Sequence, residues 1–203
     1  MKDYNIQKLE RKLRKELDAD RYQHTLGVMF TASSLAMCHG ADIQKAECAG
    51  LLHDCAKCIP NERKLKLCQE YGIEVSKTEL KAQYLLHSKL GAYLAKEQYG
   101  VTDEDVLSAI RWHTTGRPNM SVLEKIIFIA DYIEPARYKA ANLPEIRALA
   151  FRDLNQTVLR ILEDTLHYLD KGHGEIDEMS RSAFRYYYNL FNEPDDKGDS
   201  LTV

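Results

Sequence analysis

The sequence contains no apolar run near the roughly 20 residues that a membrane-spanning helix needs. Its start, MKDYNIQKLERKLRKELD, is charged throughout, so we expect no signal peptide. The formal net charge of −3 leaves no excess of positive charge for general binding to nucleic acid or to anionic membranes. The five cysteines are an odd number and do not resemble a disulfide framework. We therefore expect a cytoplasmic protein without a membrane or nucleic-acid partner.

The sequence also lacks the sustained alternation of apolar and polar residues that is typical of β-strands. It shows no internal repeat and no interdomain linker. Apolar residues instead recur at three- and four-residue steps, as in Ile6, Leu9, Leu13 and Leu17. A chain of 203 residues suits one domain with a sizeable core. We predict a single all-α domain over residues 1–192 and a disordered tail over residues 193–203.

Capping residues predict where several helices begin. The predicted starts are Asp42, the capping boxes Thr102-x-x-Asp105 and Ser121-x-x-Glu124, and Pro144. The last of these begins the longest predicted helix, over residues 144–171, which Gly172 ends. A further helix is predicted over residues 20–39, with Phe30 directed inward.

Histidine and aspartate form an ordered, widely spaced set of six residues. They are His24, His53, Asp54, His87, His113 and Asp131. Each lies in a helix or at a helix end with an apolar face, so all six side chains can point into one bundle interior. Imidazole nitrogen and carboxylate oxygen suit iron, manganese or zinc, and the lack of thiolate disfavours a structural zinc cluster.

These six residues can hold two neighbouring metal ions. One ion takes His24, His53, Asp54 and Asp131, and the second takes Asp54, His87 and His113, with Asp54 as the bridge. Two ions about 3.5–4 Å apart clamp a phosphoryl centre. Lys57 lies three residues after Asp54, so its ammonium faces the ligands if the helix continues one turn, and a solvated lysine is the alternative.

Each residue of the set also has a simpler interpretation when it is taken alone. Asp131 lies in an apolar helix and can form a buried salt bridge to an arginine or lysine. Adjacent residues such as His53 and Asp54 point about 100° apart inside a helix, so they can share an ion only at a helix end. The pair Cys55-x-x-Cys58 lacks the βαβ context of a redox motif and the second pair of a zinc ribbon. The case for a metal site rests on the joint occurrence of the six.

Five segments resemble the YqeK family of HD-domain metallohydrolases. They are RYQHTLGV (21–28), LLHDCAK (51–57), LLHSKLGAYL (85–94), IRWHTTGRPNMSVLEKIIFIADYIEPAR (110–137) and DLNQ (153–156). The resemblance implies an all-α HD-domain bundle with an interior di-iron site. It also implies symmetrical hydrolysis of diadenosine tetraphosphate into two molecules of ADP.

The same resemblance implies roles for individual residues. Asp54, Lys57 and His87 are the expected catalytic residues, and the six histidines and aspartates named above are the expected metal ligands. The expected nucleotide contacts are Lys57, His113, Thr114, Thr115, Gly116, Arg117, Tyr132 and Arg137. A glycine-containing turn lets backbone N–H groups approach phosphate, and arginine offers a planar fork for its oxygens.

The sequence departs from the family after Arg137. Relatives typically carry a Phe-Pro-Gly turn there, whereas this chain has Tyr138-Lys139-Ala140-Ala141-Asn142. The departure affects the edge of the nucleotide pocket and leaves the metal ligands unchanged.

Several other functions remain open on the residues alone. A nucleotidase or a cyclic-dinucleotide phosphodiesterase can use the same ligands, and a di-iron oxygenase has similar ones. A nucleotide sensor without turnover and a plain helical scaffold are the non-catalytic alternatives. The apolar face around Leu154, Val158 and Leu162 serves either the core or a homodimer.

Overall fold

Side-chain caps define the helix boundaries in the computed structural model, which describes residues 4–192. Asp42 accepts from the backbone N–H of Lys45, and Ser121 and Glu124 form a complete capping box, as predicted. The prediction of a disordered tail over 193–203 lies outside the described residues. The elements are α1 Ile6–Leu13, α2 Ala19–His39, α3 Ile43–Leu52, α4 Asn61–Glu70, α5 Lys77–Lys81, the 3₁₀ turn η1 Gln83–Leu85, α6 Leu86–Glu97, α7 Glu104–Trp112, α8 Val122–Ile133, α9 Leu143–Ala150, α10 Leu154–Tyr168, the π-helical turn η2 Leu169–His173 and α11 Glu178–Asn192.

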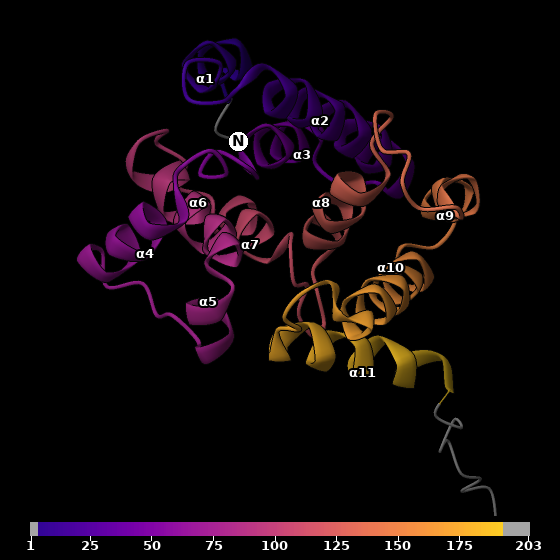
Figure 1. Cartoon of the computed structure of the whole chain (residues 1–203). Coiled ribbons are helices and arrows are strands. Elements are labelled where there is room, and N and C mark those ends of the chain that lie inside the picture. The colour runs from indigo at the N-terminus through magenta and orange to yellow at the C-terminus, as the bar shows by residue number, and fades with distance from the viewer. Residues whose placement is uncertain (1–3, 193–203) are drawn as a thin grey trace, which may run out of the picture.

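The helices pack as a bundle around α3, α7 and α8, which confirms the all-α prediction. Helix α2 packs on α3 and α8, α7 packs on α3, α6 and α8, and α10 packs on α8 and α11. In Figure 1, α2 and α3 lie together at the top, α8 lies near the centre, and α10 and α11 lie at the lower right. The site therefore forms where helices from distant parts of the sequence meet.

A glycine allows α2 and α3 to approach closely. A Cβ atom at Gly50 would lie 2.9 Å from the Cα atom of Met29, a separation that real side chains do not adopt. Leu51 and Leu52, which follow it, are fully buried. Because α3 ends directly after this contact, the close packing brings His53 beside α2 and its His24.

Three sequence predictions are wrong in detail. Residues 144–171 form two helices, because the chain turns after α9 and the side chain of Asp153 caps the start of α10. The cap of α7 is Asp103 and not Thr102, since the Asp103 carboxylate accepts from the N–H groups of Asp105 and Val106. Phe30 is 62% exposed and does not face the core.

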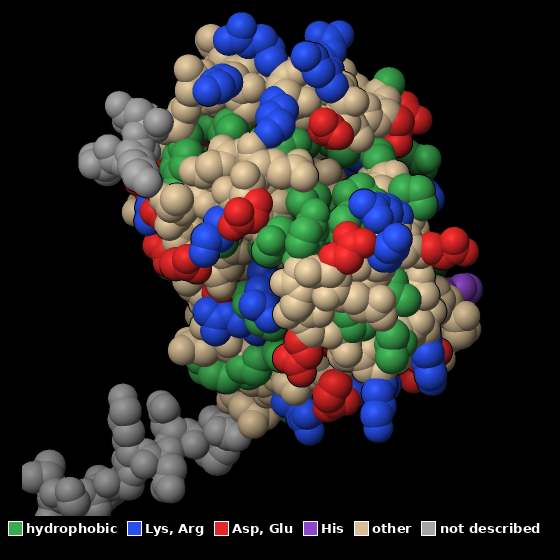
Figure 2. Space-filling model, turned by 90° about the vertical axis from the view of Figure 1, so that its left-hand side faces the viewer, with side chains coloured by type: hydrophobic (Ala, Val, Ile, Leu, Met, Phe, Trp, Pro, Cys, Tyr) green, Lys and Arg blue, Asp and Glu red, His purple; other side chains and the backbone are tan. Residues whose placement is uncertain are grey.

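The apolar face of α10 is used within the chain. Leu154, Val158, Ile161 and Leu162 all belong to the buried core. Figure 2 shows acidic and basic side chains interspersed over the face that it displays. Among the described residues, no helix is both long enough and apolar enough to span a membrane. A homodimer stays a prediction.

Candidate metal centre

The six predicted ligands converge, five of them from helix ends and His24 from within α2. His24 lies inside α2, whereas His87 is the second residue of α6, His113 follows α7 and Asp131 lies in the last turn of α8. Residues 53–58 form turns after α3. His53 and Asp54 thus lie at a helix end, where two adjacent side chains can reach the same space. This is the condition under which the sequence analysis expected them to share an ion.

Asp54 is the centre of this cluster. Its carboxyl group is nearly fully buried, and all four histidines reach it through their Nε2 atoms. The distances from Asp54 are 3.1 Å to His87 and 3.5 Å to His113 at Oδ1, and 3.5 Å to His53 and 3.8 Å to His24 at Oδ2. Asp131 joins from the other side, with its Oδ1 atom 3.1 Å from His24 Nε2 and 4.0 Å from His53 Nε2. Asp54 thus contacts all four histidines, whereas Asp131 contacts two of them.

Backbone carbonyls orient three of the four imidazoles. The Nδ1 atoms of His53, His87 and His113 lie 2.7, 2.6 and 2.7 Å from the carbonyl oxygens of Gly50, Tyr84 and Ile110, each three residues earlier. A carbonyl only accepts, so Nδ1 donates and carries the proton. The Nε2 lone pairs are therefore directed into the cluster, which is the arrangement that metal-binding histidines need.

Burial favours the neutral form of two of these imidazoles, His53 and His87. Loss of solvent lowers the pKa of His53 to about 3 and the pKa of His87 to about 4. Burial opposes ionisation of Asp54 and Asp131 as well, but positive charge beside them, from Arg21 at Asp54 and from Arg137 at Asp131, favours the carboxylate form. The pKa of each of these carboxyl groups is held well below its usual value.

The donor set fits divalent metal ions. The Nε2 atoms of His24 and His87 face carboxylate oxygens at 3.1 Å, and an Nε2 lone pair at that distance from a carboxylate oxygen repels it unless a cation lies between them. His24 Nε2, His53 Nε2 and Asp54 Oδ1 are buried atoms without a hydrogen-bond partner. Two groups have all their ligand atoms within 4.8 Å of one another: His24, His53 and Asp131, and His53, Asp54 and His113.

Asp131 is less buried than the sequence suggested. Its side chain is 24% exposed, and Arg137 donates to its Oδ1 atom at 2.6 Å. The salt bridge that the sequence left as an alternative is therefore present. It involves the same oxygen that faces His24, so Arg137 lies at the edge of the cluster.

Two further cations reach Asp54. The Lys57 ammonium lies 3.1 Å from His87 Nε2 and 3.6 Å from Asp54 Oδ1, which confirms that it faces the ligands. Arg21 donates to Asp54 Oδ2 at 2.8 Å and was missed by the sequence reasoning. Arg21 precedes His24 by three residues on α2, so helical spacing from a predicted ligand was the signal for it.

The predicted nucleotide loop has two ends with different surroundings. Thr114 Oγ1 lies 3.1 Å from both His87 Nε2 and His113 Nε2, and Gly116 adopts a φ of +64°, which favours glycine. Arg117, however, donates from Nε and Nη2 to the Glu124 carboxylate, each at 2.8 Å. Thr114 therefore lies in the cluster, whereas the guanidinium of Arg117 is directed to the capping box of α8.

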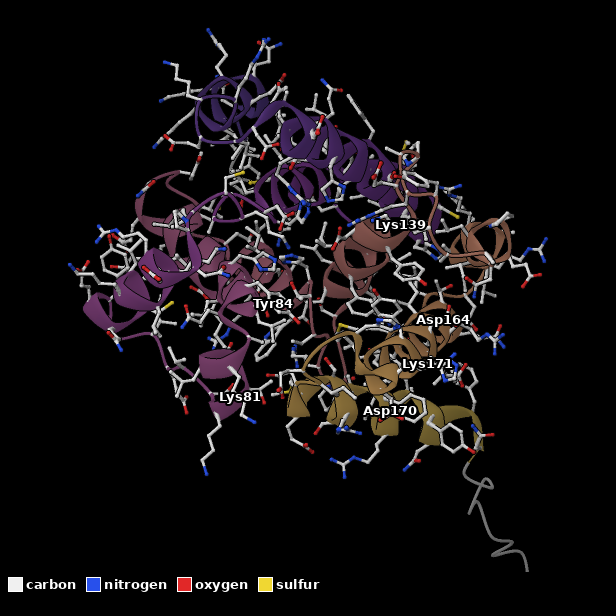
Figure 3. The ribbon with its side chains drawn as sticks, in the orientation of Figure 1. Lys81, Tyr84, Lys139, Asp164, Asp170 and Lys171 are labelled. Carbon is white, nitrogen blue, oxygen red and sulfur yellow. The ribbon has the colours of Figure 1, made fainter. Side chains whose placement is uncertain are left out.

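The end of α8 and the segment after it contact α10. Tyr132, a predicted nucleotide contact, is half-buried and donates to Asp164 at 3.4 Å. Lys139 belongs to the segment that departs from the family pattern. Figure 3 labels side chains of α5 (Lys81), η1 (Tyr84), the segment after α8 (Lys139), α10 (Asp164) and η2 (Asp170 and Lys171).

Comparison with known proteins agrees with this geometry. The HD domain model matches residues 21–136, which include all six converging residues. The chain belongs to the HD domain family. Within it, the chain groups with YqeK-like proteins, because it is 48% identical over 157 residues to a symmetrical bis(5′-nucleosyl)-tetraphosphatase of Halalkalibacterium halodurans. That match covers 76% of this chain and 82% of the relative.

Two further HD relatives extend the match. The symmetrical bis(5′-nucleosyl)-tetraphosphatase of Bacillus subtilis is 43% identical, over 78% of this chain and 84% of the relative. The crystal structure of a predicted HD superfamily hydrolase involved in NAD metabolism from Clostridium acetobutylicum has a TM-score of 0.88 at 42% identity. It covers 93% of this chain and 100% of that one. The predicted HD-domain fold, with its interior cluster of histidine and aspartate, is thus confirmed.

Proposed function

We propose that this HD-family protein hydrolyses diadenosine tetraphosphate symmetrically into two molecules of ADP. Water adds to the second phosphorus from one nucleoside, and the bond from that phosphorus to the central bridging oxygen breaks. Both halves are then ADP, and one water is consumed. The observation that carries the proposal is a buried carboxylate, Asp54, surrounded by four imidazoles and by Lys57, in a chain similar to symmetrical tetraphosphatases.

The proposed cofactor is a pair of metal ions, iron by preference, with manganese or zinc as chemically acceptable substitutes. His24, His53, Asp54 and Asp131 would hold one ion, and Asp54, His87 and His113 the other. Such a pair supplies an acidified water and charge for the phosphoryl oxygens when it is bound. The unpartnered buried atoms at His24, His53 and Asp54 support this assignment.

Cations at the cluster would bind the polyphosphate. The Lys57 side chain is 32% exposed and the Arg137 side chain is 43% exposed, so both can reach a ligand that arrives from solvent. Their charges offset the negative charge that develops during phosphoryl transfer. His113, Thr114, Thr115, Gly116 and Tyr132 complete the proposed nucleotide contacts. Arg117 is also assigned to them, although its contact with Glu124 must be exchanged for phosphate or act through the loop.

Product analysis tests this function directly. Protein purified without oxygen is analysed for metal, supplied with diadenosine tetraphosphate, and its products are separated by chromatography. ADP as the sole product is expected, whereas AMP with ATP would contradict the symmetrical cleavage. Faster hydrolysis of mononucleotides or cyclic dinucleotides would favour the nucleotidase or phosphodiesterase alternative.

A nucleotide sensor is distinguished by one variant. Asp54→Ala should lose both metal and hydrolysis. If that variant still binds the nucleotide tightly and keeps its biological output, turnover is not the function. We propose further that ADP is the product and that neither nucleic acid nor a membrane is a partner. The proposed location is the cytoplasm.

A further inference from the structure

Glu134 is a buried carboxylate in direct contact with a predicted metal ligand. It is 2% exposed, and its Oε1 atom lies 3.1 Å from His24 Nδ1. Its Oε2 atom accepts from the backbone N–H of Ala136 at 2.7 Å. A carboxylate that accepts at Oε1 places the proton of His24 on Nδ1, so the Nε2 lone pair is directed toward Asp131.

This contact makes His24 different from the other three histidines. His53, His87 and His113 each donate Nδ1 to a neutral carbonyl of their own chain segment. Only His24 among them donates to a charged group. A carboxylate partner raises the basicity of an imidazole and strengthens its bond to a metal.

The surroundings hold Glu134 in this position. A Cβ atom at Gly27 would lie 2.6 Å from Glu134 Oε2, so any larger residue at this position of α2 would displace the carboxylate. Arg147 of α9 donates to the carbonyl oxygens of Ile133, Glu134 and Arg137 at 2.9, 3.0 and 2.9 Å. These contacts fix the end of α8 and satisfy its free carbonyls.

We propose that Glu134 is a positioning residue that makes the two metal positions unequal. It fixes the tautomer of His24 and adds negative charge to it, so the ion bound by His24, His53 and Asp131 is held more tightly than the ion bound by His87 and His113. The inference rests on the proposed two-ion site. It adds a residue that touches neither the ions nor the substrate.

Binding of Mn²⁺ to the metal-free protein tests the inference without any assay of activity. Free Mn²⁺ is counted by electron paramagnetic resonance during a titration. Glu134→Gln keeps the shape but offers one acceptor in place of two, so it cannot serve both His24 and Ala136. We expect one dissociation constant to rise by about 10–100-fold and the other to stay within about twofold.

Two variants separate positioning from general loss of structure. Gly27→Ala keeps the Glu134 carboxylate but displaces it, so it should weaken binding of the same ion. In the double variant with Glu134→Gln, the loss of Mn²⁺ affinity should be smaller than the sum of the two single losses. Glu79→Gln is the matched control, because Glu79 is also buried and accepts from a backbone N–H and from Lys89, away from the cluster. It should lower stability and leave both Mn²⁺ affinities unchanged.

Three results would overturn the proposal. They are unchanged Mn²⁺ binding in Glu134→Gln, equal weakening of both ions, and a similar loss in Glu79→Gln. A native protein that binds only one Mn²⁺ contradicts the two-ion function instead. In that case Glu134→Gln must still lower the affinity for the single Mn²⁺ for the role of Glu134 to stand.

Discussion

Replacement of Lys57 by alanine is expected to slow hydrolysis while both metal ions remain bound. The Lys57 ammonium lies 3.1 Å from His87 Nε2 and 3.6 Å from Asp54 Oδ1. For the magnitude we take a phosphoryl oxygen at about 4–5 Å from the ammonium. At an effective dielectric constant of about 20, a unit charge at that distance contributes about 3–4 kcal/mol.

If that interaction develops mainly in the transition state, its loss lowers kcat by about 10²–10³-fold. The assay is steady-state release of ADP from diadenosine tetraphosphate, with metal content measured on the same samples. KM should change much less than kcat, because the ground-state polyphosphate is also held by other cations. Lys66→Ala is the control, since Lys66 is 66% exposed and pairs with Glu70 on the surface of α4.

The reasoning about Lys57 fails if the variant loses metal. Loss of metal with loss of activity would make the lysine a support for the ligands rather than a partner of the phosphate. A rise in KM at unchanged kcat would equally refute it, because the charge would then act on substrate binding alone. An intermediate recovery in Lys57→Arg would support the role of charge.

Three other predictions concern the metal ligands, pH and the fold. Asp54→Asn should weaken metal binding by more than the roughly 10–100-fold typical of an indirect contact, and metal analysis that finds two ions in the purified variant would contradict the bridge. Because burial lowers the pKa of His53 to about 3 and of His87 to about 4, the unfolded metal-free chain binds protons below about pH 6.5 that the folded one excludes. The Tm of the metal-free protein should therefore fall as pH drops from about 6.5 to about 4, and a constant Tm would refute this. Asp153→Ala should cost about 1 kcal/mol of unfolding free energy through the lost cap of α10, whereas Arg152→Ala should cost little in the same urea titration.

The clustering of the six histidine and aspartate side chains was predictable from residue type and spacing, and their role as metal ligands stays a proposal. Burying a histidine or aspartate side chain from an apolar helix costs free energy unless the side chain meets a polar partner. Such side chains therefore tend to share one polar site in the interior. The HD dipeptide at a helix end, the position of Lys57 and the capping box of Ser121 follow from local rules, and the structure agrees with each. The family resemblance then narrowed the chemistry to a phosphoanhydride.

Local rules failed where two signals competed within a few residues. Thr102 and Asp103 can both cap a helix, and the carboxylate of Asp103 does so while its other oxygen lies 2.9 Å from Lys45. The helix predicted over 144–171 is interrupted for a similar reason. Asp153 caps the start of α10, and the spacing of apolar residues does not reveal the turn that separates α10 from α9.

The sequence by itself determined the helical class, the family and the group of residues that can bind metal. Tertiary structure decided which charges meet: Arg117 with Glu124, Arg137 with Asp131, Arg21 with Asp54, and His24 with Glu134. Periodicity tells which side chains share one face of a helix, but an ion pair also depends on which helix lies opposite and at what depth. The unequal partners of the four histidines arise at this level, because three are local carbonyls and one is a carboxylate 110 residues away.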